Sequence, residues 1–201
     1  MAGPGGVPKP ATVIVGCGSW LGGDDAIGLL CLEEIERHGP PRGVRLTAAP
    51  GGGFAVWEAV RGARRAAIVD GMLGAGEPGE VRAFSLGELV DWWPPRGVDE
   101  RAGAEGGAGG AGGAGGAGGA GGAGGGDEGP RFGVTSHDIS PLDGLRLGFA
   151  VEPGLFPAEV AVFGVQMARW GRGIQGLSPE VAAALPRLVA AVRQWASGDA
   201  G

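Results

Sequence analysis

Cysteine, lysine and long apolar runs are scarce in this sequence, and each scarcity excludes a class of protein. Only two cysteines occur among the 201 residues, and neither stands in a Cys-x-x-Cys pair, so a disulfide framework is not expected. The positive charge comes mostly from scattered arginines, and the net charge is -6. Because no basic stripe is present to neutralise phosphates, nucleic acid is not expected as a partner.

Membrane and secretion signals are also missing. No segment has the ~18 or more apolar residues that span a bilayer, and residues 1–10 are Gly/Pro-rich without the apolar core of a signal peptide. We therefore expect a soluble, cytoplasmic protein whose first ten residues are flexible. A chain of this length is sufficient for one α/β domain.

Glycine and alanine dominate one long segment. Residues 106–126 repeat Gly-Gly-Ala triplets between charged, Pro-containing borders. Glycine loses the most backbone entropy on ordering and alanine buries almost no area, so the segment cannot fold alone. We interpret residues 94–130 as a disordered insertion in a surface loop. Residues 11–93 and 131–196 can then form a single domain, because long flexible loops are inexpensive to close.

Strand and helix patterns alternate outside the insertion. β-branched or apolar runs predict strands at 11–15, 44–48, 66–70, 81–84 and 159–165, and helical spacing predicts helices at 24–37, 54–60, 85–92, 141–148 and 179–195. Asp24 and Ser178 stand at expected helix N-caps. This alternation predicts an α/β fold with a three-layer α/β/α arrangement, whose mainly parallel, twisted sheet has about five strands.

Acidic residues follow two of the predicted strands. Asp24 and Asp25 lie in the turn after the first strand, and Asp70 ends the third. Ligands of open α/β sheets bind beyond the carboxyl ends of the strands, so these carboxylates are expected at one edge. His137 could join them from a loop. Two carboxylates and one imidazole would suit a divalent transition metal with open positions.

Each of these residues, taken singly, also has a purely structural explanation, and only their convergence favours a metal site. Asp24 or Asp25 could simply cap a helix, Asp70 could form a turn, and a loop histidine is commonly a surface side chain. Residues 16–21 read GCGSWL, which lacks the third glycine of a dinucleotide-binding fingerprint, and no Walker lysine follows. Cys17 could be a nucleophile or a metal ligand, but burial is the simpler interpretation.

The ordered set of motifs resembles the nickel-iron hydrogenase maturation proteases. Residues 16–28, GCGSWLGGDDAIG, are similar to the family's opening motif of Gly-x-Gly-Asn, a short apolar run, Asp-Asp/Glu and Gly. The strand ending in Asp70, the Ser136-His137-Asp138 loop and the late segments at 160–165 and 176–180 follow in the family's order.

The resemblance implies an endopeptidase of the aspartic type that removes the C-terminal extension of a hydrogenase large-subunit precursor after nickel insertion. It also implies that Asp25, Asp70 and His137 are the metal-binding, catalytic residues. The nickel is expected to be presented by the substrate, although other divalent transition metals could substitute. We expect a monomer with no membrane partner.

Two departures bear on substrate choice. Ser19 replaces the usual asparagine, and Trp20 is bulkier than the pattern suggests. A non-catalytic hydrogenase assembly factor is the alternative function, and a nucleotide-binding α/β protein is a more distant one.

Overall fold

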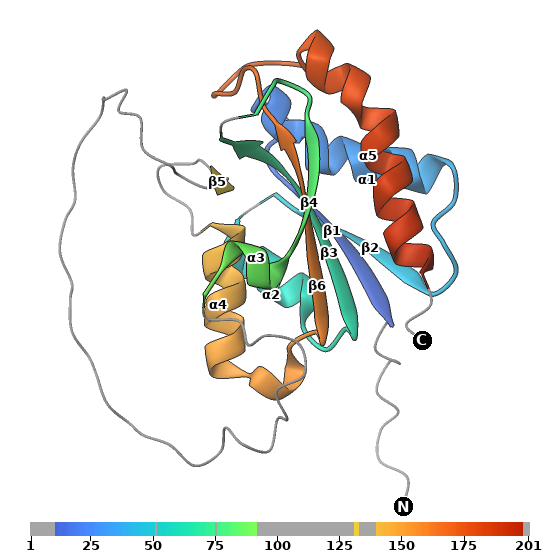
Figure 1. The fold of residues 1–201 in the computed structure, drawn as a ribbon, viewed down its shortest axis with the longest axis vertical. Coiled ribbons are helices and arrows are strands. Elements are labelled where there is room, and N and C mark those ends of the chain that lie inside the picture. The colour runs from blue at the N-terminus through green and yellow to red at the C-terminus, as the bar shows by residue number, and fades with distance from the viewer. Residues whose placement is uncertain (1–10, 51, 75, 92–130, 133–139, 199–201) are drawn as a thin grey trace, which may run out of the picture.

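The computed structural model describes residues 11–50, 52–74, 76–91, 131–132 and 140–198 (Figure 1). Its strands are β1 Thr12–Cys17, β2 Val44–Ala49, β3 Arg65–Leu73, β4 Val81–Ser85, β5 Arg131–Phe132 and β6 Glu159–Gln166. Its α-helices are α1 Ile27–Arg37, α2 Gly53–Val60, α3 Leu86–Leu89, α4 Pro141–Val151 and α5 Pro179–Ser197, with 3-10 turns η1 Asp24–Ala26 and η2 Pro153–Leu155. The expected flexible N-terminus at 1–10 and the insertion at 94–130 lie outside the described residues.

One mixed sheet organises these elements, in the order β2-β1-β3-β6-β4. The first four strands are parallel, β4 runs antiparallel to β6, and the two-residue β5 pairs antiparallel with the end of β3. This confirms the predicted mainly parallel α/β sheet and adds the short β5. Because β6 lies between β3 and β4, the chain after the insertion completes the sheet begun before it.

Helices cover both faces of the sheet, as the three-layer prediction requires (Figure 1). Side chains alternate between faces along each strand, so Ile14 packs with α1 and α5 while Val13 and Val15 pack with α2 and α4. Each face therefore has its own apolar core. Among the described residues, no helix is long and apolar enough to cross a membrane.

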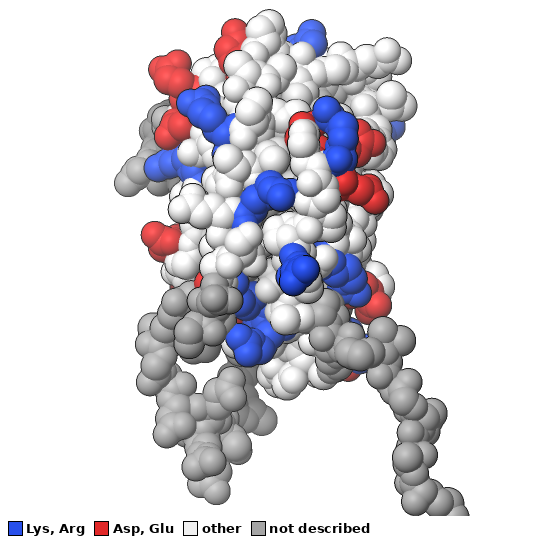
Figure 2. Space-filling view, turned by 90° about the vertical axis from the view of Figure 1, so that its right-hand side faces the viewer, with Lys and Arg blue, Asp and Glu red and all other residues white. Residues whose placement is uncertain are grey.

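The face on the side of α1 and α5 carries charges of both signs. Figure 2 shows arginine side chains separated by uncharged surface and flanked by acidic ones.

At the C-terminal end of α5, the buried Arg65 guanidinium donates to the Glu159 carboxylate at 3.0 Å and to the Gly198 carbonyl at 2.7 Å. It also lies 4.2 Å from the Trp195 ring centroid, so this cation fastens α5 to the sheet.

Three local predictions were wrong. The third strand does not end at Asp70, because pairing with β5 and β6 extends β3 to Leu73. The helix after Ser85 ends at Leu89 within the described residues, not at Trp92. Asp24 is not a helix N-cap, because it lies inside η1, whose cap residue is Gly23. Ser178 is the N-cap residue of α5, as predicted, but its hydroxyl donates to Asp24.

Candidate functional site

Asp70 lies on β3 just beyond the last residue pair that β3 forms with β1, Gly16 with Val69. By strand alternation its side chain faces the same core as Ile68, toward α2 and α4. Its partner on β6 is Gly164, which has no side chain to fill the neighbouring space. Asp70 is only 1% exposed, and it lies beside the carboxyl end of β1, before β3 itself ends at Leu73.

The two carboxylate oxygens of Asp70 differ in their surroundings. Oδ1 accepts a hydrogen bond from the Gly71 N–H at 2.9 Å, whereas Oδ2 has no hydrogen-bond partner within the described part of the chain. A buried acceptor left without a partner costs about 1–3 kcal/mol, more when it is charged. Such an atom fits a site that a cation or a proton donor completes.

Asp25 lies in η1 and folds back over the turn that follows β1. Its backbone carbonyl occupies the space where a Cβ of Gly18 would stand, and Gly18 has φ 109°. A Cβ at Gly22 would lie 2.9 Å from Asp25 Oδ2. The glycines of the opening motif are therefore needed because the aspartate packs directly on the turn.

The pKa values of both carboxyl groups are raised, and the charge of Asp25 contributes to the shift of Asp70. Burial and then the nearby Asp25 charge raise the pKa of the Asp70 carboxyl well above its usual range, against a small lowering by the Gly71 N–H. Burial also raises the pKa of Asp25, which a backbone hydrogen bond from Ser19 partly offsets. Two carboxylates brought together without a neutralising group favour binding of a proton or a cation.

Cys17, the last residue of β1, shares this neighbourhood. It is buried, and burial followed by the charges of Asp70 and Asp25 raises the pKa of its thiol well above the ordinary value. A thiol that holds its proton is a poor nucleophile and a poor metal ligand. The interpretation of Cys17 as a buried core residue is confirmed.

Asp24 has a different role from its neighbour Asp25. It is fully buried, and its carboxylate accepts four hydrogen bonds, from Ala168 N at 2.9 Å, Arg169 N at 2.8 Å, Ser178 N at 2.6 Å and Ser178 Oγ at 3.0 Å. With this set of donors Asp24 holds the loop before α5 against the turn after β1. It is a structural residue rather than a ligand.

His137, the third predicted ligand, lies outside the described residues, so its position relative to Asp25 and Asp70 stays a prediction. Within the described ranges, no three His, Cys, Asp or Glu side chains form a group that could hold a metal ion. The two carboxylates fit a transition metal only with a further donor from elsewhere.

Gln166 was missed by the sequence reasoning. It ends β6, is 6% exposed, and its Oε1 has no hydrogen-bond partner within the described ranges, although Nε2 lies 3.4 Å from the Met167 carbonyl. Its only sequence signal is a polar residue that closes a buried apolar strand near the predicted site edge.

The rival nucleotide site is disfavoured by charge. In dinucleotide-binding folds the pyrophosphate lies at the N-terminus of the first helix. Here the turn leading into α1 carries Asp24 and Asp25. Two carboxylates at that position would repel an anionic ligand.

No family model and no curated protein sequence matches this chain. Its fold matches solved structures over nearly its whole length. The [NiFe] hydrogenase maturation protease HybD from Thermococcus kodakarensis is 22% identical, with a TM-score of 0.59 over 92% of this chain and 98% of that one. Hydrogenase maturating endopeptidase HybD from E. coli is 19% identical, with a TM-score of 0.58 over 90% and 89%.

The endopeptidase HycI from Escherichia coli is 18% identical, with a TM-score of 0.60 over 95% of this chain and 94% of that one. At these identities the likeness establishes the fold, which is the one that the sequence resemblance predicts. The chain therefore has the α/β fold of the hydrogenase maturation endopeptidases.

Proposed function

We propose that this chain is a metal-dependent endopeptidase that removes the C-terminal extension of a nickel-iron hydrogenase large-subunit precursor after nickel insertion. The observation that carries the proposal is the unpartnered Asp70 Oδ2, buried near Asp25 at the carboxyl edge of the sheet. The fold shared with solved hydrogenase maturation endopeptidases supports the same reaction class. We further propose that the protein acts as a cytoplasmic monomer.

In this hypothesis Asp25, Asp70 and His137 bind nickel that the precursor already holds, so that the metal is part of the substrate. Bound there, nickel would polarise the scissile carbonyl or a water molecule. Asp70 would contribute its free Oδ2 while Oδ1 keeps the Gly71 N–H, which fixes the carboxylate plane. Other divalent transition metals could take the same donors.

The residues around the carboxylates favour this mechanism over covalent catalysis. The Cys17 thiol keeps its proton because burial and two nearby carboxylates raise its pKa. No Gly-x-Ser-x-Gly elbow occurs in the sequence either. Hydrolysis by a metal-activated water requires neither a cysteine nor a serine nucleophile.

Tail removal from a purified precursor tests the proposal, with nickel-loaded and nickel-free precursor compared. We expect cleavage of the loaded form only, and loss of that cleavage in Asp25→Asn, Asp70→Asn and His137→Ala. Asp143→Asn, an exposed change on α4, is the matched control and should cleave normally. Retained cleavage in all three site variants would refute the assignment.

The alternative, a non-catalytic assembly factor, predicts a different result in the same experiment. An assembly factor would form a stable complex with the precursor and leave its tail intact under both nickel conditions. Gel filtration of the mixture, followed by mass spectrometry of the precursor, separates the two functions.

A further inference from the structure

Two loops beside the candidate site are joined along their backbones. They are residues 18–23 after β1 and residues 167–177 between β6 and α5, together called the loop pair below. Gly23 N donates to the Ile174 carbonyl at 2.9 Å, Gly173 N to the Leu21 carbonyl at 2.9 Å and Gly171 N to the Gly22 carbonyl at 3.2 Å. These hydrogen bonds hold the two loops together without a bound protein.

Asp24 fixes this unit to the body of the protein. Its carboxylate takes the N–H groups of Ala168 and Arg169 at one end of the second loop and both donors of Ser178 at the other. Hydrogen bonds to an ionised carboxylate are stronger than those between neutral groups. The loop pair is therefore pre-organised, which lowers the entropy lost when it binds a partner.

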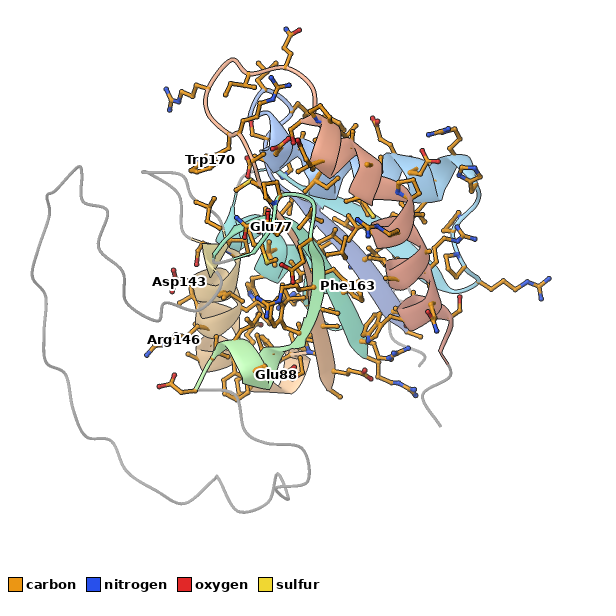
Figure 3. All side chains as sticks on the ribbon, turned by 45° about the horizontal axis from the view of Figure 1, so that its top comes forward. Glu77, Glu88, Asp143, Arg146, Phe163 and Trp170 are labelled. Atoms are coloured by element: carbon orange, nitrogen blue, oxygen red, sulfur yellow. The ribbon has the colours of Figure 1, made fainter. Side chains whose placement is uncertain are left out.

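The loop pair exposes large apolar side chains. Trp20 is 47% exposed, Leu21 57% and Trp170 42%, so three of the six large apolar side chains that are exposed in the described structure lie here. Figure 3 shows Trp170 at the outer edge of its loop, directed away from the sheet. The exposed parts of these side chains do not stabilise the fold, because they bury no apolar area in the core. Rigid, exposed aromatic residues are typical of protein-binding surfaces.

The positive charge of the second loop favours a partner surface that carries acidic residues. Residues 167–177 contain two arginines and no acidic residue. The Arg169 guanidinium lies 3.3 Å from the Leu177 carbonyl, which holds it beside the loop, and Arg172 is exposed. An apolar surface edged by arginines complements an apolar patch edged by Asp or Glu.

The position of the loop pair relative to the site identifies the occupant. Asp25 packs on Gly22, so the first loop directly borders the candidate ligands. A protein whose C-terminal tail reaches Asp25 and Asp70 must bring its folded body against the surface around them. Within the described structure, the loop pair is an exposed apolar surface that adjoins the site through Gly22.

We propose that Trp20, Leu21 and Trp170 form the surface that docks the folded body of the protein substrate, through an apolar patch bordered by acidic residues. This inference rests on the proposed function, and it assigns substrate selection to residues that do not take part in the cleavage chemistry. Trp20, a departure from the family pattern, then becomes a determinant of which precursor is accepted.

Steady-state cleavage of nickel-loaded large-subunit precursor tests the docking surface. We expect Trp20→Ala with Trp170→Ala to raise KM about tenfold or more while kcat at saturation stays within about twofold, because hot-spot aromatics contribute binding rather than chemistry. Leu21→Ala should raise KM less. Leu147→Ala, which changes an exposed leucine on α4, is the matched control and should change neither constant. Arg172→Glu should raise KM and reverse the effect of added salt on it.

Each outcome is decisive. An unchanged KM in the double variant, with wild-type cleavage present, overturns the docking surface but leaves the peptidase proposal intact. Absence of wild-type cleavage and binding overturns both. If the double variant instead loses a concentration-dependent dimer in sedimentation velocity and keeps its KM, the surface joins two copies of this chain and the proposal is wrong. Far-ultraviolet circular dichroism and thermal unfolding must match the wild type for the comparison of KM to count.

Discussion

Asp24 shows how a single buried carboxylate can organise a surface that lies outside the core. Its four donors come from the two ends of the loop between β6 and α5, and both of its carboxylate oxygens accept hydrogen bonds there. We predict that Asp24→Ala lowers the free energy of unfolding by about 3–5 kcal/mol, because it leaves several buried N–H groups without an acceptor. Urea denaturation followed by tryptophan fluorescence measures the loss.

Glu77→Gln, which changes an exposed acid on the β3–β4 loop, is the control for Asp24 and should stay within about 0.5 kcal/mol of the wild type. Asp24→Ala should also raise the rate of hydrogen exchange at residues 168–178. A stability equal to the wild type would show that the four hydrogen bonds are not what holds the loop pair.

Asp70 makes the stability of the metal-free protein depend on pH. Burial and Asp25 raise its folded-state pKa above the unfolded value of about 3.9, so the folded protein binds the proton more tightly. The stabilisation is complete below the unfolded pKa and is lost as pH rises through the folded pKa. Each pKa unit between the two states corresponds to about 1.4 kcal/mol.

We therefore predict that Asp70→Asn makes the metal-free protein more stable at neutral pH and reduces the decline in stability above pH ~4. Part of the decline should remain, since the pKa of Asp25 is raised in the same direction. Chemical denaturation at a series of pH values measures both effects. If the variant and the wild type have parallel stability profiles, Asp70 is not the buried titrating group that this structure indicates.

For single residues, the sequence predicted the edge of the sheet at which the carboxylates lie, but not their hydrogen-bond partners. Strand ends and the parallel sheet placed Asp25 and Asp70 at one edge, and the structure keeps them there. Fold rules alone could not distinguish Asp24 from Asp25, which only the family resemblance did, because the donors to the Asp24 carboxylate lie 144 to 154 residues away along the chain. Local helix-capping rules favoured an N-cap, but these distant donors satisfy the carboxylate instead.

At the scale of secondary-structure elements, the site depends on the close contact between α1 and the sheet. A Cβ on Gly28, the last residue of the opening motif, would overlap the carbonyl oxygens of Val69 and Cys17. Cys17 is the last residue of β1, and Val69 directly precedes Asp70 on β3. Gly28 therefore lets α1 approach both strands and sets the position of η1 with Asp25.

We predict that Gly28→Ala lowers stability by about 2–4 kcal/mol, because backbone on both sides prevents relief of the overlap, and lowers precursor cleavage more than tenfold. A thermal unfolding curve and the cleavage assay measure these losses. Gly154→Ala, where an added Cβ meets nothing within 4 Å, is the control and should change neither. Normal cleavage in Gly28→Ala would show that the spacing of α1 from the sheet does not position Asp25.

Elements with a strong internal pattern could be predicted, and their ends could not. The helical spacing at 179–195 gave α5, and the β-branched run at 11–15 gave β1. The end of β3 depends on hydrogen bonds to β5 and β6, which lie far along the chain. Because a strand continues wherever a neighbour pairs with it, no property of residues 71–73 alone could reveal the extension.

At the scale of the whole molecule, one sheet unites segments on either side of the long Gly/Ala tract. β6 follows the tract in sequence and pairs with β3 and β4, both of which precede it. The alternation of strand and helix patterns predicted a mainly parallel sheet, but it did not predict which strands β6 pairs with.

We predict that replacing residues 106–126 by a five-residue Gly/Ser linker leaves the fold and the cleavage reaction unchanged. Shortening a flexible loop changes its closure entropy by only about 0.6 kcal/mol per halving, so the free energy of unfolding should shift by about 1 kcal/mol or less. Urea denaturation and the kcat and KM for nickel-loaded precursor measure the outcome. A KM that rises in the shortened protein, with stability unchanged, would instead assign the tract to substrate binding.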